Sequence, residues 1–529
     1  MHVPEEMKGS ARSRIVSGAL TVMAAFIVSN LIGLFAKTLT ARYFGTGVES
    51  SAFFAANRFS EILFSLVAGG ALGSAFIPVF TGLLVKEDRQ KAWKLASSII
   101  NIVTAVLIVL SILTIIFSEG VVHYLLAPGF NAADTALTAR LLRIQVLSAI
   151  IFGMSGLVMA ILNSHQHFLL PAIAPAMYQA GWIFGIVVLS PTIGIDGLAW
   201  GVVIGAFFHL IVQLPLTLRL KDCSYSLGFG LWMAEVKEVA RLMAPRLLGV
   251  AIIQLNFLLN TYLASFQLAG AITAISLAFP LMIMPEAAIA QSIAIAALPT
   301  FSALVAKGDI QEMRQTLAAT LRAVMLLSIP ASVGLVMLRE PIVQLLYGGQ
   351  AFGARSVDLV AWALLWYAIG LVGHSIVEVT SRAFYALHDT RTPVIIGVWA
   401  MLANLGLSFL FSALFTKIGW MPHGALALAN STATAIESVI LLALMKKKLE
   451  GIAESHIINA LWKSVLASVI MGSLIYWIGI VFARESLLAS TAISICIGVL
   501  SYVVILILLK TPEVNMVIAM IKAKIFKKA

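Results

Sequence analysis

The chain has 529 residues, of which 60% are hydrophobic and only 11% are charged, and its mean hydropathy is +1.00. Soluble domains carry about 25% charged residues, so this composition excludes an ordinary soluble protein. Apolar runs of about 20 residues, the length that spans a bilayer as a helix, recur along the whole chain. They differ from the short alternating segments of a membrane β-barrel. We therefore predict an all-α, polytopic membrane protein.

Fourteen apolar segments are long enough to span a membrane. The first begins at about Ile15 and lacks a small-residue cleavage site, so we predict a retained helix and not a signal peptide. Several segments exceed 25 residues, which indicates tilt or extension beyond the bilayer. The predicted spans are 15–41, 50–84, 93–118, 136–162, 168–190, 194–218, 238–265, 270–304, 315–338, 355–386, 392–416, 422–446, 458–482 and 486–510.

The formal net charge is +11, and the basic residues fall mainly in the N-terminus, the even-numbered loops and the C-terminal tail. Lys and Arg mark the cytoplasmic side of a membrane protein. The charge therefore indicates topology and not nucleic-acid binding, and both termini are predicted to be cytoplasmic. The two cysteines, Cys223 and Cys496, lie far apart and have no metal-binding spacing.

Three pairs of segments are similar at one offset. "SAFIPVFTGLLVKEDRQKAWKL" (74–95) matches "IAALPTFSALVAKGDIQEMRQTL" (295–317), and "VVHYLLAPGF" (121–130) matches "IVQLLYGGQAF" (342–352). "AILNSHQHFLLPAIAP" (160–175) matches the charged stretch "RAFYALHDTRTPV" (382–394) and its continuation. The offset of 221–222 residues covers six spans, and an even number preserves orientation, so we predict two parallel repeats.

The repeat predicts the domain organisation. An N-terminal segment (1–14) precedes a first six-helix lobe (15–220) and a second six-helix lobe (238–447). Two further helices (458–510) and a basic tail (511–529) follow. Two such halves commonly frame the central pathway of a transporter.

Four motifs, "ARYFGTG" (41–47), "SAFIPVF" (74–80), "APGF" (127–130) and "FYALHDTRTPV" (384–394), occur in an order that resembles the MurJ (MviN) family. This family is a branch of the multidrug/oligosaccharidyl-lipid/polysaccharide (MOP) exporter superfamily, and the resemblance covers nearly the whole chain. It implies a monomeric flippase of the bacterial inner membrane that moves lipid II, a peptidoglycan precursor linked to undecaprenyl pyrophosphate, to the outer leaflet. It also implies two lobes around a central cavity, and a hydrophobic groove on the last two helices for the lipid tail.

The chain departs from the family where arginines and an aspartate usually line the cavity. Lys37 is one residue from a lost arginine, and Arg58 lies six residues before another. Both could replace the missing positive charge on nearby helix faces. The aligned positions hold Asn30, Ala36, Ser51, Phe64 and Pro280.

Ionisable groups inside spans are costly and are therefore candidates for function. A pyrophosphate needs cations, and arginine offers bidentate geometry. Two alternatives stay open: Arg58 and Glu61 can pair on one helix face, and Arg42 can extend to the interface. The predicted substrate-binding residues are Asn30, Lys37, Arg42, Ser51, Arg58 and Glu61.

The second half supplies candidates for ion coupling. Glu286 follows Pro285 in mid-span, where a proline bends the helix and frees backbone carbonyls. Glu378 and Arg382 are spaced for an ion pair. Without a nucleotide-binding motif or another cofactor, we expect coupling to Na⁺, H⁺ or the membrane potential. The predicted ion-coupling residues are Glu286, Glu378, Asn404 and Glu437.

Alternating access requires spans that bend. Proline removes a backbone hydrogen bond and glycine eases a change of φ and ψ, although small residues also allow close helix packing. The predicted hinge residues are Gly69, Gly70 and Gly73 in the second span, with Pro280 and Pro285 in the eighth.

Competing functions remain within the superfamily: export of another polyprenyl-linked glycan, or an ion-coupled drug antiporter, for which twelve spans are typical. No enzyme motif or metal-ligand cluster is present in the sequence. A membrane-embedded glycosyltransferase would need a long outer catalytic loop, so we predict a transporter that contacts a lipid-linked oligosaccharide and membrane lipids.

Overall fold

The structure is a computed structural model that describes residues 25, 28–67, 70–482 and 486–511. The predicted N-terminal segment and nearly all of the predicted basic tail lie outside these residues. Within the described residues all regular secondary structure is helical, as predicted. The chain forms two compact units, Met1–Ile272 with Gly349–Phe352 and Thr273–Gly348 with Gly353–Ala529.

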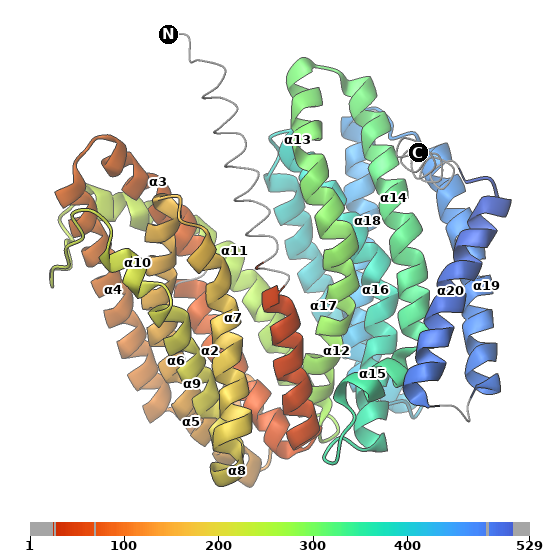
Figure 1. Ribbon diagram of the computed structural model, residues 1–529, viewed down its shortest axis with the longest axis horizontal. Coiled ribbons are helices and arrows are strands. Elements are labelled where there is room, and N and C mark those ends of the chain that lie inside the picture. The colour runs from red at the N-terminus through yellow and green to blue at the C-terminus, as the bar shows by residue number, and fades with distance from the viewer. Residues whose placement is uncertain (1–24, 26–27, 68–69, 483–485, 512–529) are drawn as a thin grey trace, which may run out of the picture. The chain divides into compact units, whose positions relative to one another are not determined.

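Unit 1 is built mainly from long apolar helices around α6, which packs on α2, α3, α4 and α9. Its core includes Phe76, Phe80, Trp93 and Leu107. Its helices (Figure 1) are residues 28–44, α2 (Val48–Val67), α3 (Gly70–Val85), α4 (Arg89–Ile116), α5 (Ser118–Val121), η1 (Val122–Leu126), α6 (Ala132–Ser164), α7 (Leu169–Phe184), η2 (Gly185–Leu189), α8 (Ser190–Ile193), α9 (Ile195–Ile211), α10 (Leu214–Leu218) and α11 (Ala234–Ser265).

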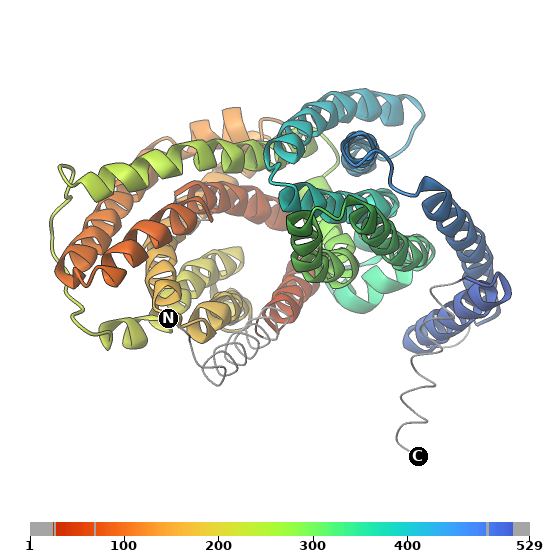
Figure 2. The same cartoon turned by 90° about the horizontal axis from the view of Figure 1, so that it is seen from above.

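Unit 2 is centred on α16, which packs on α13, α14, α15 and α18. The pair α19–α20 packs on α14 and stands at one margin of the unit (Figure 2). The Tyr502 hydroxyl anchors this pair by donating to the Leu326 carbonyl at 2.7 Å. The helices are α12 (Ala271–Glu286), η3 (Ala287–Gln291), α13 (Ser292–Lys307), α14 (Ile310–Met337), α15 (Arg339–Tyr347), α16 (Ala354–Ala386), α17 (Arg391–Lys417), α18 (His423–Lys448), α19 (Glu454–Val481) and α20 (Leu487–Leu508).

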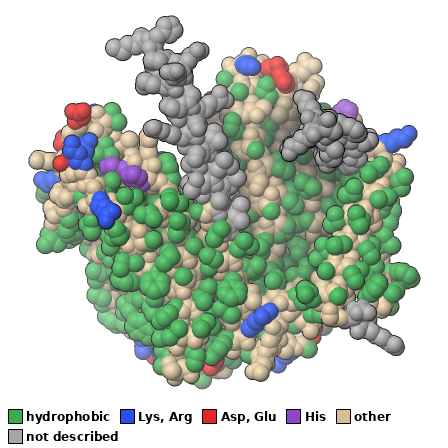
Figure 3. All heavy atoms as spheres, viewed as in Figure 1, with side chains coloured by type: hydrophobic (Ala, Val, Ile, Leu, Met, Phe, Trp, Pro, Cys, Tyr) green, Lys and Arg blue, Asp and Glu red, His purple; other side chains and the backbone are tan. Residues whose placement is uncertain are grey.

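Twelve helices of the described residues are long and apolar enough to cross a membrane. The other two predicted spans correspond to residues 28–44 and to the α2–α3 segment. On the face drawn in Figure 3, hydrophobic side chains cover the middle of each unit and charged side chains gather toward its ends. This distribution is the one expected for helices surrounded by lipid tails.

The predicted repeat is visible in the helix boundaries. The 28-residue helices α4 and α14 begin 221 positions apart, and the 33-residue helices α6 and α16 begin 222 positions apart. Two short elements that were not predicted, the α5–η1 segment and α15, lie between these helices and also begin 221 positions apart. A nine-residue helix carries too few turns to give a clear periodic pattern.

The paired loops end their helices in the same way. Gln166 and His388 both have positive φ, of 62° and 57°. The following amides of His167 and Asp389 donate to carbonyls five residues earlier, those of Leu162 and Phe384, at 2.9 and 3.0 Å. This pattern is a Schellman cap, which satisfies the last helical carbonyls. The turn is therefore a helix terminator that both halves share.

The charged turn at Asp389 has a structural role. Its Oδ1 accepts from the Thr392 amide at 3.0 Å, and its Oδ2 accepts from Lys448 Nζ at 2.6 Å. The hydrogen bond from Lys448 is the main cause that lowers the pKa of Asp389 to about 2, and the bond from the Thr392 amide adds to it. Asp389 thereby ties the start of α17 to the end of α18.

Glycines allow α7 and α9 to pack backbone against backbone. A Cβ on Gly185 would lie 2.5 Å from the Gly201 Cα and 2.6 Å from the Gly197 carbonyl oxygen. A Cβ on Gly181 would lie 2.2 Å from the Gly205 Cα. These glycines are spaced four residues apart on each helix, which is the small-residue pattern of closely packed membrane helices.

We predict that Gly185→Ala lowers the free energy of unfolding by about 2 kcal/mol, a typical cost of overpacking a core. The backbone atoms that the new methyl group meets cannot move aside as a side chain would. Thermal unfolding in detergent measures the change. Gly249→Ala in α11 is the matched control, because no atom of the described residues lies within 4 Å of its added Cβ. Equal unfolding temperatures for both variants would contradict the packing argument.

We also predict a pH-dependent contribution from Asp389. Because its folded-state pKa is below the ordinary value of 3.8, its stabilisation is complete above that value and is lost as the pH falls toward about 2. Asp389→Asn should cost about 1 kcal/mol at pH 7. The difference in unfolding temperature from the unmodified protein should shrink below pH 4. A difference that is constant down to pH 2.5 would show that the ion pair with Lys448 contributes nothing.

Candidate functional site

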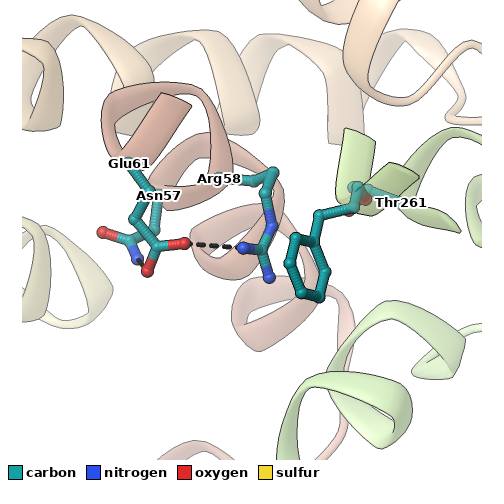
Figure 4. Close-up of polar contacts among 5 residues, drawn as sticks. Asn57, Arg58, Glu61 and Thr261 are labelled. Carbon is teal, nitrogen blue, oxygen red and sulfur yellow. Dashed lines mark hydrogen bonds and ion pairs between the residues drawn. The ribbon is translucent and has the colours of Figure 1, made fainter. Parts of the chain in front are cut away.

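Arg58 on α2 is the centre of a polar cluster in unit 1 (Figure 4). Its Nη1 donates to Glu61 Oε2 at 2.7 Å, as the spacing of three residues predicts. Asn57 Nδ2 donates to the other oxygen of the Glu61 carboxylate at 2.8 Å. The Arg58 side chain is 24% exposed and that of Glu61 45%. The cluster is therefore partly buried and remains accessible to a ligand.

The Arg58 guanidinium is also held from a second helix. It lies over the ring of Phe257 on α11, with 4.9 Å between Cζ and the ring centroid. Arg58 Nε is buried and has no hydrogen-bond partner among the described residues. A guanidinium that is held by stacking and remains 24% exposed is suited to bind an anionic oxygen.

Lys37 adds a second positive charge. In the helix of residues 28–44, Gly33, Lys37 and Thr40 share one face by their i, i+4, i+7 spacing. This face packs on α7, because the Thr40 hydroxyl accepts from the indole of Trp182 at 2.9 Å. Lys37 is half-buried and within electrostatic range of Glu61 and Arg58. Two cations and one carboxylate give the cluster a net charge of about +1.

The other predicted binding residues of the first half lie elsewhere. Asn30 is exposed and two turns from Lys37 on the same helix. Arg42 is exposed near the end of that helix and packs against Gly349. Ser51 is buried and lines a small cavity of unit 1 beside Gly129 and Ser265. The structure therefore brings together Lys37, Arg58 and Glu61, but not these three.

The "APGF" motif lies at this small cavity, where Gly129 packs against Ser265. The Gly129 amide donates to Ser265 Oγ at 3.1 Å, and a Cβ at Gly129 would lie 2.3 Å from the Ser265 carbonyl oxygen. Only glycine allows this approach of the turn to the end of α11. The motif therefore packs the η1–α6 turn and contributes no ionisable group there.

A second polar cluster lies within unit 2. Arg382 Nη2 and Glu378 Oε1 are 2.7 Å apart on α16, as their spacing predicts. Glu286, at the end of α12, is only 4% exposed and lies within electrostatic range of both. Gln291 Nε2 donates to Glu286 Oε2 at 3.3 Å. Arg382 therefore pairs with Glu378, and Glu286 is a second carboxylate nearby that accepts its hydrogen bond from Gln291.

Neutral polar groups extend this cluster between α16 and α18. His374 Nε2 lies 3.2 Å from Asn430 Oδ1 and 3.4 Å from the Thr434 hydroxyl. Glu437, one turn beyond Thr434, faces α17, where its Oε1 is 3.4 Å from a Cβ built on Gly397. Asn404 is buried two turns further along α17. Among the described residues, no group of three or more His, Cys, Asp or Glu residues is placed to hold a metal ion.

The predicted hinge residues differ in their surroundings. Gly69 lies outside the described residues, and Gly70 begins α3. An added Cβ at Gly73 meets no atom of the described residues within 4 Å, so close packing does not explain this glycine. Pro280 is inside α12, and Pro285 lies two residues before the π-helix η3. π-Helical turns often occur at functional sites.

The side chains that contact Arg58, Glu61 and Glu286 were not all predicted from the sequence. Asn57 is four residues before Glu61, so helical spacing could have identified it. Phe257 is on a different helix, 199 positions from Arg58, and no local pattern indicates that contact. Gln291 reaches Glu286 across the π-helical turn, whose spacing differs from that of an α-helix.

Comparison with known proteins gives one consistent result. A family model described as lipid II flippase MurJ matches residues 40–497. The lipid II flippase MurJ of Burkholderia cenocepacia is 29% identical over 88% of this chain and 90% of its own length. The probable lipid II flippase MurJ of Bdellovibrio bacteriovorus is 30% identical over 86% of this chain and 87% of its own.

Solved structures of the same family and of a related transporter share the fold of this chain. A lipid II flippase MurJ in an inward closed conformation is 25% identical, with a TM-score of 0.78, over 92% of this chain and 98% of that chain. An inward-facing multidrug resistance MATE transporter of the MOP superfamily has a TM-score of 0.68 over 82% of this chain and 98% of that chain. Its 14% identity shows a common fold alone.

Proposed function

Because this chain belongs to the lipid II flippase MurJ family, we propose that it moves lipid II from the inner to the outer leaflet of the bacterial inner membrane. The cargo is a peptidoglycan precursor on undecaprenyl pyrophosphate. Its charged head cannot cross hydrocarbon unaided, since a single charge at the bilayer centre costs several kcal/mol. The protein must supply a polar path.

The observation that supports this function best is the position of Arg58. Its guanidinium is held by Glu61 and Phe257 and retains a donor without a partner among the described residues. Lys37 is within electrostatic range of it. A pyrophosphate carries several negative charges, so it can compete with the single Glu61 carboxylate for both cations. The cluster thus replaces the cavity arginines that the family usually has.

Transport is proposed to follow alternating access, with the protein acting as a monomer whose termini both lie in the cytoplasm. The basic even-numbered loops support this orientation. The shared caps at Gln166 and His388 keep the cytoplasmic turns firm. Bending is then taken up inside the spans, at Gly73 and at the Pro285–η3 segment.

Energy for the cycle is proposed to come from an ion gradient or the membrane potential. The buried Glu286 carboxylate near the Glu378–Arg382 pair supports Na⁺ or H⁺ coupling, because Arg382 forms its ion pair with Glu378 and Glu286 is a second carboxylate within electrostatic range. A bound cation would balance the second carboxylate.

Neutralising Arg58 or Lys37 should abolish transport. In a bacterial strain depleted of its own lipid II flippase, the unmodified protein should restore growth, whereas Arg58→Gln and Lys37→Gln should not. Arg58→Lys should rescue only partly, because lysine keeps the charge but loses the planar stacking on Phe257. Lys94→Gln, on an exposed residue near the start of α4, is the control. Full rescue by Arg58→Gln at equal membrane abundance would refute the assigned role of this cluster.

Failure of the unmodified protein in the same strain, with normal membrane insertion, would instead point to another polyprenyl-linked glycan. A strain dependent on export of such a glycan then identifies the cargo. The two outcomes separate the choice of cargo from the role of Arg58.

Restricting the proposed hinges should slow transport without unfolding the protein. Gly73→Ala is sterically free among the described residues, so a loss of lipid flipping would report on backbone freedom alone. Pro285→Ala should act in the same direction by allowing a regular helix before η3. Flipping is measured in proteoliposomes and stability by thermal unfolding. Unchanged flipping in both variants would exclude bending at these positions.

Neutralising Glu286 or Glu378 should remove the coupling of transport to an ion gradient. Glu286→Gln and Glu378→Gln should reduce the stimulation of flipping by an imposed Na⁺ or H⁺ gradient in proteoliposomes. Glu340→Gln, an exposed residue beside Arg339, is the matched control. Stimulation that persists in both unit 2 variants would place the coupling site elsewhere.

A further inference from the structure

The segment between α10 and α11 presents an unusual edge of large apolar side chains. Residues 221–233, here called the strap, contain no helix and have turns only at 221–222 and 231–232. Trp232 is 91% exposed and Leu227 is 87% exposed, the highest values among the large hydrophobic residues described. Tyr225, Phe229 and Leu231 are exposed beside them. In water, so large an apolar patch would be unfavourable, so it indicates a contact surface.

The strap alternates small and large residues. Ser224, Ser226, Gly228 and Gly230 separate the large side chains. In an extended chain, successive side chains point to opposite sides. Leu227 and Phe229 therefore lie on the side opposite Ser226 and Gly228. Tyr225 is different, because its hydroxyl donates to Asn101 Oδ1 on α4.

The small side of the strap is bonded to one face of α4. Asn101 Nδ2 donates to the carbonyls of Ser226 and Gly228 at 2.8 and 2.9 Å. Ser97 Oγ accepts from the Ser226 amide at 3.2 Å, and Trp93 Nε1 donates to the Lys221 carbonyl at 3.4 Å. Trp93, Ser97 and Asn101 are spaced four residues apart, so they form a polar ladder along the helix.

The ladder extends away from the charged end of α4. Asn101 is twelve residues from Arg89, which corresponds to about 18 Å along the helix. Beyond the strap, the same face continues with Ile108 and Ile112, and both are exposed. The strap therefore lies on a face of α4 that is otherwise apolar and exposed along a membrane span. Non-helical backbone is tolerated at membrane depth only if its polar groups find partners. The ladder supplies partners for the carbonyls of Lys221, Ser226 and Gly228 and for the Ser226 amide.

The charges at the ends of the strap suit a phospholipid surface. Asp222 lies 3.6 Å from Arg89, and Glu235 lies 2.6 Å from Lys91, so both carboxylates are balanced by α4. Lys221 and Lys237 are exposed, and Lys237 Nζ lies over the Trp232 ring at 5.9 Å. Aromatic rings and lysines together are typical of the membrane interface.

We propose that the strap is a membrane-interface anchor. Its apolar edge inserts among the lipid headgroups and upper acyl chains of the leaflet that meets the N-terminal end of α4. Lys221 and Lys237 contact anionic lipid phosphates, and the Trp93–Ser97–Asn101 ladder holds the extended backbone in register. The occupant of this surface is lipid, because the strap continues an exposed apolar helix face.

Site-directed spin labelling of the full chain in vesicles of phosphatidylethanolamine and phosphatidylglycerol tests the proposal. Cys223→Ser and Cys496→Ser remove the native thiols, and labels are attached through Leu227→Cys or Trp232→Cys. References are Ile112→Cys on the exposed apolar face of α4 and Lys86→Cys in an exposed loop. The strap labels should collide with oxygen more than with a water-soluble nickel complex, as the Ile112 label does. Nickel accessibility equal to that at Lys86 would overturn the anchor.

Two further arms make the outcome specific. Asn101→Leu should release the strap and raise nickel accessibility at 227 and 232 but not at 112. Thr104→Val is its control on the same helix, because the Thr104 hydroxyl has no partner among the described residues.

Replacing phosphatidylglycerol with phosphatidylcholine should reduce the insertion depth of the strap labels, and an unchanged depth would refute the lysine contacts. Shielding of both labels from oxygen and nickel would mean a protein partner or a second copy, and would also overturn the proposal.

Discussion

Hydrocarbon solvates neither charges nor unpaired backbone groups, and this constraint determines most of the structure. Each long helix satisfies its own backbone inside the membrane. Helix ends carry caps, as at Asp88, Asp309 and Asp389, which each accept from an amide three residues later. Two pairs of charged side chains within the spans, Arg58–Glu61 and Glu378–Arg382, combine opposite signs.

The same constraint makes the exceptions informative. Arg58 retains a buried donor without a described partner, and Glu286 is a buried carboxylate near the Glu378–Arg382 ion pair. Both arrangements are energetically incomplete in the protein alone. Under the proposed function, an anionic ligand would complete the cluster in unit 1 and a cation the cluster in unit 2.

Much of the fold follows from local sequence. Hydrophobic run length predicted the twelve membrane-length apolar helices of the described residues, and the 221–222 offset reappears in the boundaries of α4, α6, α14 and α16. Ion pairs within a helix were also predictable, because Arg58–Glu61 and Glu378–Arg382 depend only on helical spacing. Contacts between helices were not: the Phe257 ring under Arg58 and the ladder of α4 under the strap depend on tertiary packing. The π-helical turn after Glu286 also escaped, since its irregular spacing has no simple periodic signal.

The central claim is that Arg58 and Lys37 bind the pyrophosphate of the cargo. The most direct measurement is the affinity of the purified protein for lipid II, compared with a lipid that carries the same polyprenyl chain and no phosphate. Binding of lipid II should weaken at least tenfold, or about 1.4 kcal/mol, in Arg58→Gln and Lys37→Gln, and neither change should affect binding of the phosphate-free lipid. Equal affinity of the unmodified protein and both variants for lipid II would contradict it.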